Sequence, residues 1–299
     1  MQKMCTLCPR NCAVDRTLGE RGVCGQTSEL KVARAALHMW EEPCISGESG
    51  SGTVFFSGCS LHCVFCQNQE IANGTVGKEI SVERLAEIFL ELQEKGANNI
   101  NLVTPGHFVP QIKEALLLAK KKGMTLPIVY NTSSYESLDT IKSLDGFVDI
   151  YLPDFKYMSE ELAKKYSHAA DYAKVVKENL AEMVRQTGMP VFDERGEEGL
   201  IKRGTIVRHL LLPGCLEDSK AVIRYLYETY GNQIYISIMS QFTPLPHVAE
   251  FPELNRKVTE EEYEELVDFA IELGVEQGFI QEEDVASDSF IPDFNCEGV

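Results

Sequence analysis

An apolar segment and a cysteine-rich segment adjoin in one stretch of this 299-residue chain, Thr53-Val54-Phe55-Phe56-Ser57-Gly58-Cys59-Ser60-Leu61-His62-Cys63-Val64-Phe65-Cys66. Its first five residues have the apolar pattern of a short buried strand. Cys59, Cys63 and Cys66 follow at the spacing Cys-x3-Cys-x2-Cys. Thiolates are the usual ligands of iron–sulfur clusters, and three of them leave one iron of a four-iron cluster open for a substrate or cofactor. The stretch therefore predicts a strand followed by a [4Fe-4S] loop. A closed zinc site that recruits His62 as fourth ligand is the alternative.

Strands and helices alternate after this loop. Apolar residues at helical spacing separate the expected strands, and Thr259 and Glu262 form a capping box for a last helix. The six expected strands are 53–57, 100–104, 127–131, 147–152, 206–212 and 234–239. One long helical stretch is expected over 159–186. Six strand–helix units in series predict an α/β fold with a parallel sheet. Eight units would close a barrel, so six predict an open, partial (β/α)6 barrel.

Polar residues gather at the ends of these strands. They are Cys59, Thr104, Asn131, Asp154 and Ser240. Because α/β architectures build their sites at the carboxyl ends of parallel strands, we expect these residues to face one site.

Four further cysteines stand near the N-terminus, at Cys5, Cys8, Cys12 and Cys24. Their spacing suits one metal site, either structural zinc or an auxiliary iron–sulfur cluster. A site with fewer ligands, or one that includes Cys44, stays open as an alternative. The first fifty residues show no sustained periodicity, so we expect residues 1–50 to form a Cys-rich metal-binding segment and connector. Residues 51–250 are expected to form the partial barrel, and 251–299 an acidic helix and tail that complete it.

Composition narrows the class of protein. The chain carries 46 acidic and 28 basic side chains, a net charge of −18, and 16 of the acidic residues lie in 250–299. Such a charge disfavours nucleic acid and anionic membranes as partners. No apolar run approaches the roughly 20 residues of a membrane span, and the first residues lack a secretory signal. Ten cysteines then point to metal or redox chemistry in a reducing compartment. We expect a soluble cytoplasmic protein.

The cysteine loop, with Phe65 before its last cysteine, resembles that of the radical S-adenosylmethionine (SAM) superfamily. Three stretches resemble the PflX-like subgroup, which is similar to pyruvate formate-lyase activating enzymes: 5–12, 40–47 and 66–68. The resemblance implies reductive cleavage of SAM at the cluster to a 5′-deoxyadenosyl radical, with flavodoxin or ferredoxin as reductant. It favours hydrogen abstraction from a glycine of a partner glycyl-radical enzyme. The alternatives are a small molecule, a peptide or another protein site as substrate, or a non-enzymatic iron–sulfur redox protein.

The resemblance also implies a set of residues around SAM: Phe65, Thr104, Gly106, Asn131, Thr132, Asp154, Lys156 and Arg208. Lys156 is expected to neutralise the SAM carboxylate, with a surface salt bridge as the alternative, and Asp154 to hold a cation or the ribose. Arg208 stands in an apolar strand and needs a buried anionic partner. Two positions depart from the family pattern. Thr104-Pro105-Gly106-His107 replaces a Gly-Gly-Glu-type turn, and Gln241-Phe242 replaces a Tyr-His pair.

Overall fold

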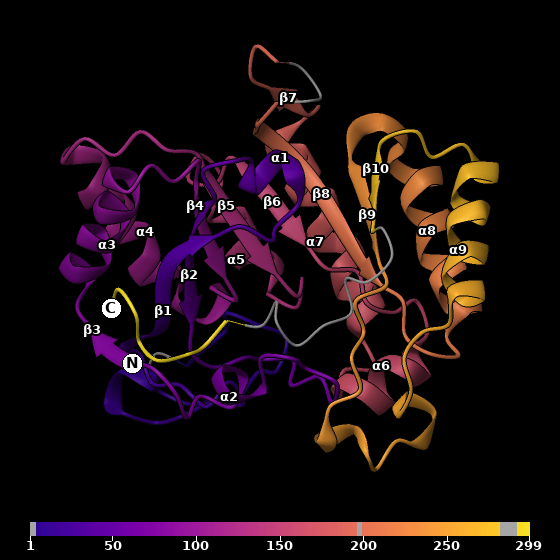
Figure 1. Ribbon diagram of the computed structural model, residues 1–299. Coiled ribbons are helices and arrows are strands. Elements are labelled where there is room, and N and C mark those ends of the chain that lie inside the picture. Colours follow the sequence, from indigo (N-terminus) through magenta and orange to yellow (C-terminus); the bar gives the residue numbers. More distant parts are fainter. Residues whose placement is uncertain (1–3, 196–198, 282–291) are drawn as a thin grey trace.

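A computed structural model describes residues 4–195, 199–281 and 292–299 (Figure 1). Its centre is a ten-stranded sheet of order β10-β9-β8-β6-β5-β4-β2-β1-β3, with β7 paired to β8. The strands are β1 (Leu30–His38), β2 (Ser51–Phe56), β3 (Lys78–Ile80), β4 (Ile100–Val103), β5 (Ile128–Thr132), β6 (Ile150–Pro153), β7 (Val191–Phe192), β8 (Ile201–Leu210), β9 (Tyr235–Met239) and β10 (Gly278–Ile280). The six predicted strands correspond to β2, β4, β5, β6, β8 and β9, which pair in parallel in chain order. The α/β class with a mostly parallel sheet is therefore confirmed, whereas the partial barrel stays a prediction.

The helices lie mainly between successive parallel strands. They are α1 (Pro43–Ser46), α2 (Gln69–Ala72), α3 (Val82–Glu94), α4 (Val109–Lys121), α5 (Leu138–Lys142), α6 (Glu160–Ser167), α7 (Tyr172–Thr187), α8 (Leu216–Tyr230) and α9 (Glu260–Leu273). The single helical stretch expected over 159–186 is wrong. His168 adopts a left-handed conformation, with φ of 52°, which ends α6 and lets the chain turn before α7 begins.

The first fifty residues contain more regular structure than predicted. β1 runs antiparallel to β2 and also pairs with β3. The sequence pattern missed β1 because its register shifts between Val32 and Arg34, so buried residues do not alternate along it. The strand over residues 30–38 was therefore not predicted.

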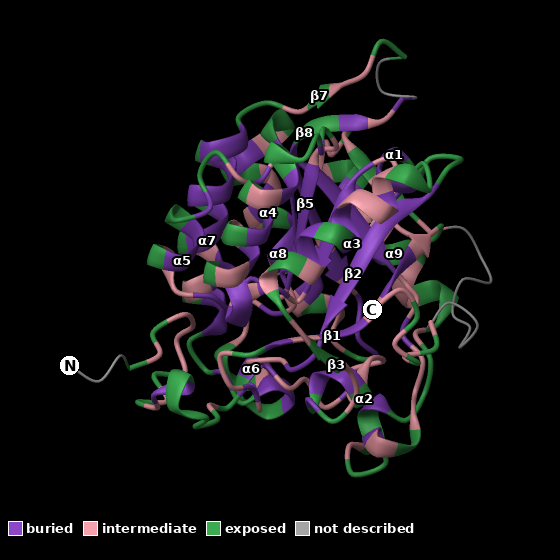
Figure 2. Cartoon of the chain, turned by 90° about the vertical axis from the view of Figure 1, so that its left-hand side faces the viewer, coloured by how far each residue is buried: buried purple, intermediate pink, exposed green. Residues whose placement is uncertain are grey.

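Two large apolar clusters hold the helices to the sheet. One joins α3 and α4 to β2, β4 and β5, and the other joins α7, α8 and α9 to β8 and β9. In Figure 1, α3 and α4 lie at one end of the sheet, α8 and α9 at the other, and α7 between them. A smaller cluster places Cys44 and Ile45 of α1 against Ile150 and Ile206 of the strands. The central strands are buried over most of their length (Figure 2).

The final described residues pair with β1. The Ala35 amide donates to the Glu297 carbonyl at 2.8 Å, and the Cys296 amide donates to the Ala33 carbonyl at 3.0 Å. Arg34 adds an ion pair with Glu297 at 2.8 Å. Residues 282–291 of the predicted acidic tail lie outside the described residues. The boundaries of the three predicted units stay predictions.

Across the described ranges, we find no helix with the length and apolarity needed to cross a bilayer.

Candidate active site

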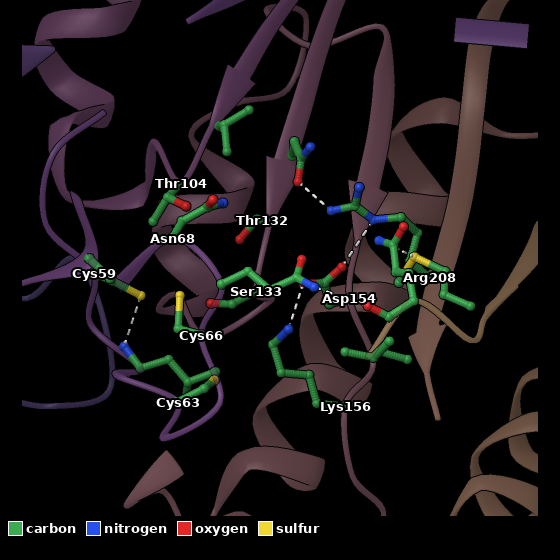
Figure 3. A pocket seen from close by; sticks show the side chains of 18 of the residues that line it. Cys59, Cys63, Cys66, Asn68, Thr104, Thr132, Ser133, Asp154, Lys156 and Arg208 are labelled. Carbon is green, nitrogen blue, oxygen red and sulfur yellow. Dashed lines mark hydrogen bonds and ion pairs between the residues drawn. The ribbon is translucent and has the colours of Figure 1, made fainter. Parts of the chain in front are cut away.

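A pocket of about 340 Å³ opens at the carboxyl ends of the parallel strands. Cysteines from the loop after β2 form one wall, and charged side chains from the strand ends form the other (Figure 3). Ten of the predicted site residues line it: Cys59, Cys63, Phe65, Cys66, Thr104, Asn131, Thr132, Asp154, Lys156 and Arg208. The expected gathering of polar strand ends is thus present.

The cysteine wall consists of Cys59, Cys63 and Cys66. The Cys59 sulfur accepts a hydrogen bond from the Leu61 amide at 3.4 Å, and the Cys63 sulfur accepts one from the Ser167 hydroxyl at 3.1 Å. Burial raises the pKa of Cys63, and it raises the pKa of Cys66 to about 12. Cys63 and Cys66 therefore need a strong positive charge beside them to become thiolates, which a metal centre would supply.

These thiols fit an iron–sulfur cluster better than a single metal ion. Among the described residues, neither this loop nor the N-terminal segment has three Cys, His, Asp or Glu side chains already grouped around one ion position. The His62 ring nitrogen instead makes a 2.7 Å hydrogen bond with the Val23 carbonyl, and His62 is absent from the pocket wall. The zinc alternative stays a prediction, and the orientation of His62 gives it no support. Three thiols on one side of an open pocket suit a cluster with one iron left for a ligand.

The charged wall is a chain of buried ion pairs. One carboxylate oxygen of Asp154 lies 2.7 Å from Lys156 Nζ, and the other lies 3.0 Å from Arg208 Nε. Burial works to raise the pKa of Asp154, but the two cations outweigh it and lower that pKa. The pKa of Lys156 is raised: burial opposes its charge, and Asp154 restores it. The Lys156 side chain is only 16% exposed, so the alternative of a surface salt bridge is wrong.

Arg208 has the buried anionic partners that its apolar strand required. Besides Asp154, it contacts Glu41 Oε2 through Nη1 at 3.2 Å and donates from Nη2 to Asn131 Oδ1 at 2.6 Å. The next residue, His209, points away and bonds the Phe155 carbonyl at 2.7 Å. Its burial lowers the pKa of His209 to about 4, so this imidazole is neutral and structural.

Glu41 is a pocket residue that the sequence analysis did not single out. It follows β1, and its carboxylate accepts hydrogen bonds from Asn101 at 2.9 Å and Asn131 at 3.3 Å. Burial raises the pKa of Glu41, while Arg208 works to lower it. Glu41 belongs to the stretch 40–47 that carries the subgroup resemblance. A carboxylate just before Pro43, which begins a buried helix, is a signal that could have identified it.

Gly106 is a misplaced prediction. It begins a short 3-10 helix (Gly106–Phe108) and is not among the pocket-lining residues. A Cβ atom there would lie 2.7 Å from Glu136 Oε1, so the glycine lets the backbone approach a buried carboxyl group. Glu136 also accepts a short hydrogen bond from the Thr132 hydroxyl. Burial raises the pKa of Glu136 to about 7.

Amide side chains form a further part of the pocket. Gln241 stands where the family pattern has a tyrosine, and its carbonyl accepts a hydrogen bond from Gln67 at 3.0 Å. Gln281 donates to the Gln241 side chain at 3.0 Å. All three line the pocket, whereas Ser240 does not. Phe242 packs instead against Phe65, with ring centroids 6.2 Å apart.

The N-terminal cysteines lie on a segment that packs against the cysteine loop. Burial raises the pKa of Cys8 to about 12, and charge on the Cys12, Cys24 and Cys5 thiols adds to the increase. The four thiols therefore lie within electrostatic reach of one another, and the nature of their metal stays a prediction. Cys44 does not join them, because it packs in the apolar cluster under α1.

The protein thus has an α/β fold with a three-cysteine loop on one wall of its pocket and charged strand ends on the other. Residues 53–198 match the sequence model of the "Radical SAM superfamily". The chain is therefore similar to that superfamily over these residues.

Relatives of known sequence or structure are distant. An uncharacterized protein of Methanocaldococcus jannaschii, MJ0674, is 28% identical over 276 residues, covering 90% of this chain and 74% of the relative. HydG, a maturase of the [FeFe]-hydrogenase, aligns with a TM-score of 0.51 at 13% identity over 78% of this chain and 52% of its own. SuiB of Streptococcus suis, bound to SAM, aligns with a TM-score of 0.47 at 9% identity, covering 76% of this chain and 49% of SuiB. The chain thus spans about half the length of these two solved structures. The HydG alignment supports the fold alone.

Proposed function

We propose that this protein is a radical SAM enzyme that cleaves SAM reductively at a [4Fe-4S] cluster held by Cys59, Cys63 and Cys66. The observation that carries the proposal is the placement of these thiols and of the Asp154–Lys156–Arg208 ion pairs on facing walls of one pocket. The three cysteines would hold the cluster, which would supply the electron for reductive cleavage of SAM and so for hydrogen abstraction from the substrate.

The charged wall orients SAM in this proposal. SAM carries a carboxylate and an ammonium group on its methionyl part. Lys156 is a fixed cation beside the cysteine loop, close enough that its charge acts on the Cys63 thiol. It can pair with the SAM carboxylate, while Asp154 keeps Lys156 charged and in place. Asn131 and Thr132 end β5 at the same edge and offer hydrogen bonds to the ligand.

For the substrate, we favour a glycine of a partner glycyl-radical enzyme, with flavodoxin or ferredoxin as reductant in the cytoplasm. The support is the resemblance of stretches 40–47 and 66–68 to activating enzymes, now extended by the place of Glu41 and Asn68 in the pocket.

A second candidate keeps the chemistry and takes a small molecule, a peptide or another protein site. The row of Gln67, Gln241 and Gln281 favours it, since these amides can hydrogen-bond a polar substrate and Gln241-Phe242 replaces the Tyr-His pair of activating enzymes.

The test uses anaerobically reconstituted protein with SAM, dithionite and the soluble proteome of the source organism. We expect 5′-deoxyadenosine from the wild type and none from Cys63→Ala. A persistent glycyl radical signal in electron paramagnetic resonance would support the activase role. Formation of 5′-deoxyadenosine without that signal would favour the second candidate. A cluster whose spectrum is unchanged by SAM would contradict the enzyme proposal and favour a redox protein.

A further inference from the structure

The N-terminal segment contacts the cysteine loop at every position between its first two ligands. Arg10 Nε donates to the Ser60 carbonyl at 2.8 Å, and Arg10 Nη2 donates to the Leu61 carbonyl at 3.2 Å. The next residue, His62, bonds the Val23 carbonyl at 2.7 Å. Residues 60–62 are therefore held from outside the pocket by a segment that lies about fifty residues earlier in the chain.

The same guanidinium group also binds the element on the other side of the loop. Arg10 Nη2 donates to the Ser167 carbonyl at 2.9 Å, and Nη1 donates to the His168 carbonyl at 2.5 Å. These carbonyls end α6, where a cation is favoured by the exposed carbonyl groups. Ser167 is also the residue whose hydroxyl donates to the Cys63 sulfur. One side chain thus joins the loop to the residue that hydrogen-bonds a proposed cluster ligand.

Arg10 is itself held in a defined place. Its guanidinium carbon lies 5.1 Å from the centre of the Tyr135 ring. Immediately before it in the chain, the Leu7 carbonyl accepts hydrogen bonds from the Ser137 amide and the Thr140 hydroxyl, both at 3.0 Å. An arginine with its geometry fixed on both sides loses little entropy when it makes several hydrogen bonds.

A close backbone contact links the segment to the start of the loop. Gly58 has φ of 93°, and a Cβ atom there would lie 2.5 Å from the Cys24 carbonyl oxygen. The last N-terminal cysteine therefore touches the residue before Cys59.

From these contacts we infer that Arg10 is a positioning residue that fixes the shape of the Cys59–Cys66 loop, and that the segment of Cys5, Cys8, Cys12 and Cys24 is the frame that holds Arg10 in place. The inference rests on the proposed function, because it concerns the loop proposed to hold the cluster. It makes the N-terminal segment part of the structural support of the active-site loop.

Hydrogen exchange of the full chain tests this inference without turnover. The Val64 amide donates to the Tyr166 carbonyl at 2.8 Å, so its exchange rate reports on the contact between the cysteine loop and α6. The Ser137 amide reports on docking of the N-terminal segment. In Arg10→Gln we expect exchange at Val64 to accelerate at least about tenfold, because charge-assisted hydrogen bonds are lost, while Ser137 stays protected. Arg21→Gln is the matched control, since Arg21 contacts only the Gly25 carbonyl at 2.8 Å in the described hydrogen bonds.

A second measurement distinguishes a role of Arg10 in positioning the cysteine loop from a general contribution of Arg10 to stability. With iron content matched, we expect Arg10→Gln to change the electron paramagnetic resonance spectrum of the reduced protein and its response to SAM, and Arg10→Lys to restore part of the wild-type response. Unchanged Val64 exchange and an unchanged spectrum would overturn the inference. So would equal acceleration at Val64 and Ser137, which would make Arg10 a docking residue only. Both readouts are independent of 5′-deoxyadenosine formation, so failure of the proposed activity would be recognised separately.

Discussion

The two walls of the pocket are built in opposite ways. The cysteine wall comes from eight consecutive residues of one loop, Cys59 to Cys66. The charged wall brings together Glu41, Asp154, Lys156 and Arg208, which the chain places after β1, after β6 and within β8. The cysteines of the first wall are neighbours in the sequence, whereas the charged groups of the second come from distant parts of the chain and compensate one another's charges. We therefore expect changes in the cysteine wall to affect chemistry, and changes in the charged wall to affect stability.

The largest effect is expected for Cys66→Ala. Loss of one thiolate should remove bound iron and abolish 5′-deoxyadenosine formation, while the unfolding free energy of the metal-free protein changes by about 1 kcal/mol or less. Iron analysis, product assay and urea unfolding of the metal-free form measure the three quantities. A Cys66→Ala variant with full iron content would contradict the expectation that changes in the cysteine wall affect chemistry.

Arg208→Leu tests the charged wall. It leaves the carboxylates of Glu41 and Asp154 buried with fewer partners, which should destabilise the protein by about 3–5 kcal/mol. Arg203→Leu is the control on the same strand, because Arg203 is exposed and contacts the Gln186 carbonyl. Urea unfolding of both variants is the measurement, and equal losses would show that β8 tolerates no arginine replacement, whatever its partners.

The buried carboxyl group behind the charged wall predicts a pH dependence. The pKa of Glu136 is about 7 in the folded protein and near 4.5 when unfolded, because burial disfavours its charge. The folded state then holds the proton more tightly, so this stabilisation is complete below pH 4.5 and is lost as the pH rises to about 7. Glu136→Gln should remove up to about 3 kcal/mol of this pH dependence. Denaturant unfolding at pH 5 and pH 8 measures it. A wild-type slope that persists in the variant would assign it to other groups.

A smaller effect is expected at the start of the cysteine wall. In Gly58→Ala, a Cβ atom would meet the Cys24 carbonyl at 2.5 Å. Gly96→Ala has a similar positive φ, of 85°, and nothing within 4 Å of its Cβ position. We expect Gly58→Ala to lower the free energy of unfolding by about 2 kcal/mol more than Gly96→Ala does. Both substitutions strain the backbone, and only Gly58→Ala adds a steric clash. Thermal unfolding of the two variants measures the difference. Similar losses of stability would show that the N-terminal segment shifts to accommodate the added methyl group.

The same contrast explains what the sequence could reveal. The cysteine loop and the six parallel strands are local patterns, and both were predicted from contiguous residues. Asp154, Lys156 and Arg208 were placed by resemblance to a family. Glu41 was missed because its role depends on β1, which brings the N-terminal segment across the sheet, and the irregular register of β1 hides its strand pattern.

Gly106 shows a different limit of sequence reasoning. The motif match placed it correctly at the end of β4, but the direction in which a turn faces depends on what packs behind it. Here that neighbour is Glu136, which lies thirty residues later in the chain. Sequence can indicate that a strand end carries a turn, and only packing decides whether the turn reaches the ligand.

The pairing of the final described residues with β1 has a consequence for how the protein is made. Arg34 and Asp293, which are hydrogen-bonded at 3.0 Å, are separated by 259 positions in the chain. At ribosomal rates of roughly 5–20 residues per second, part of the β1 edge stays unpaired for on the order of 10–50 s until residues 292–299 have been synthesised. An exposed strand edge can pair with other chains during that time. Slower translation should therefore lower the soluble yield, and supplying residues 292–299 as a separate peptide should raise the yield of a chain that lacks them.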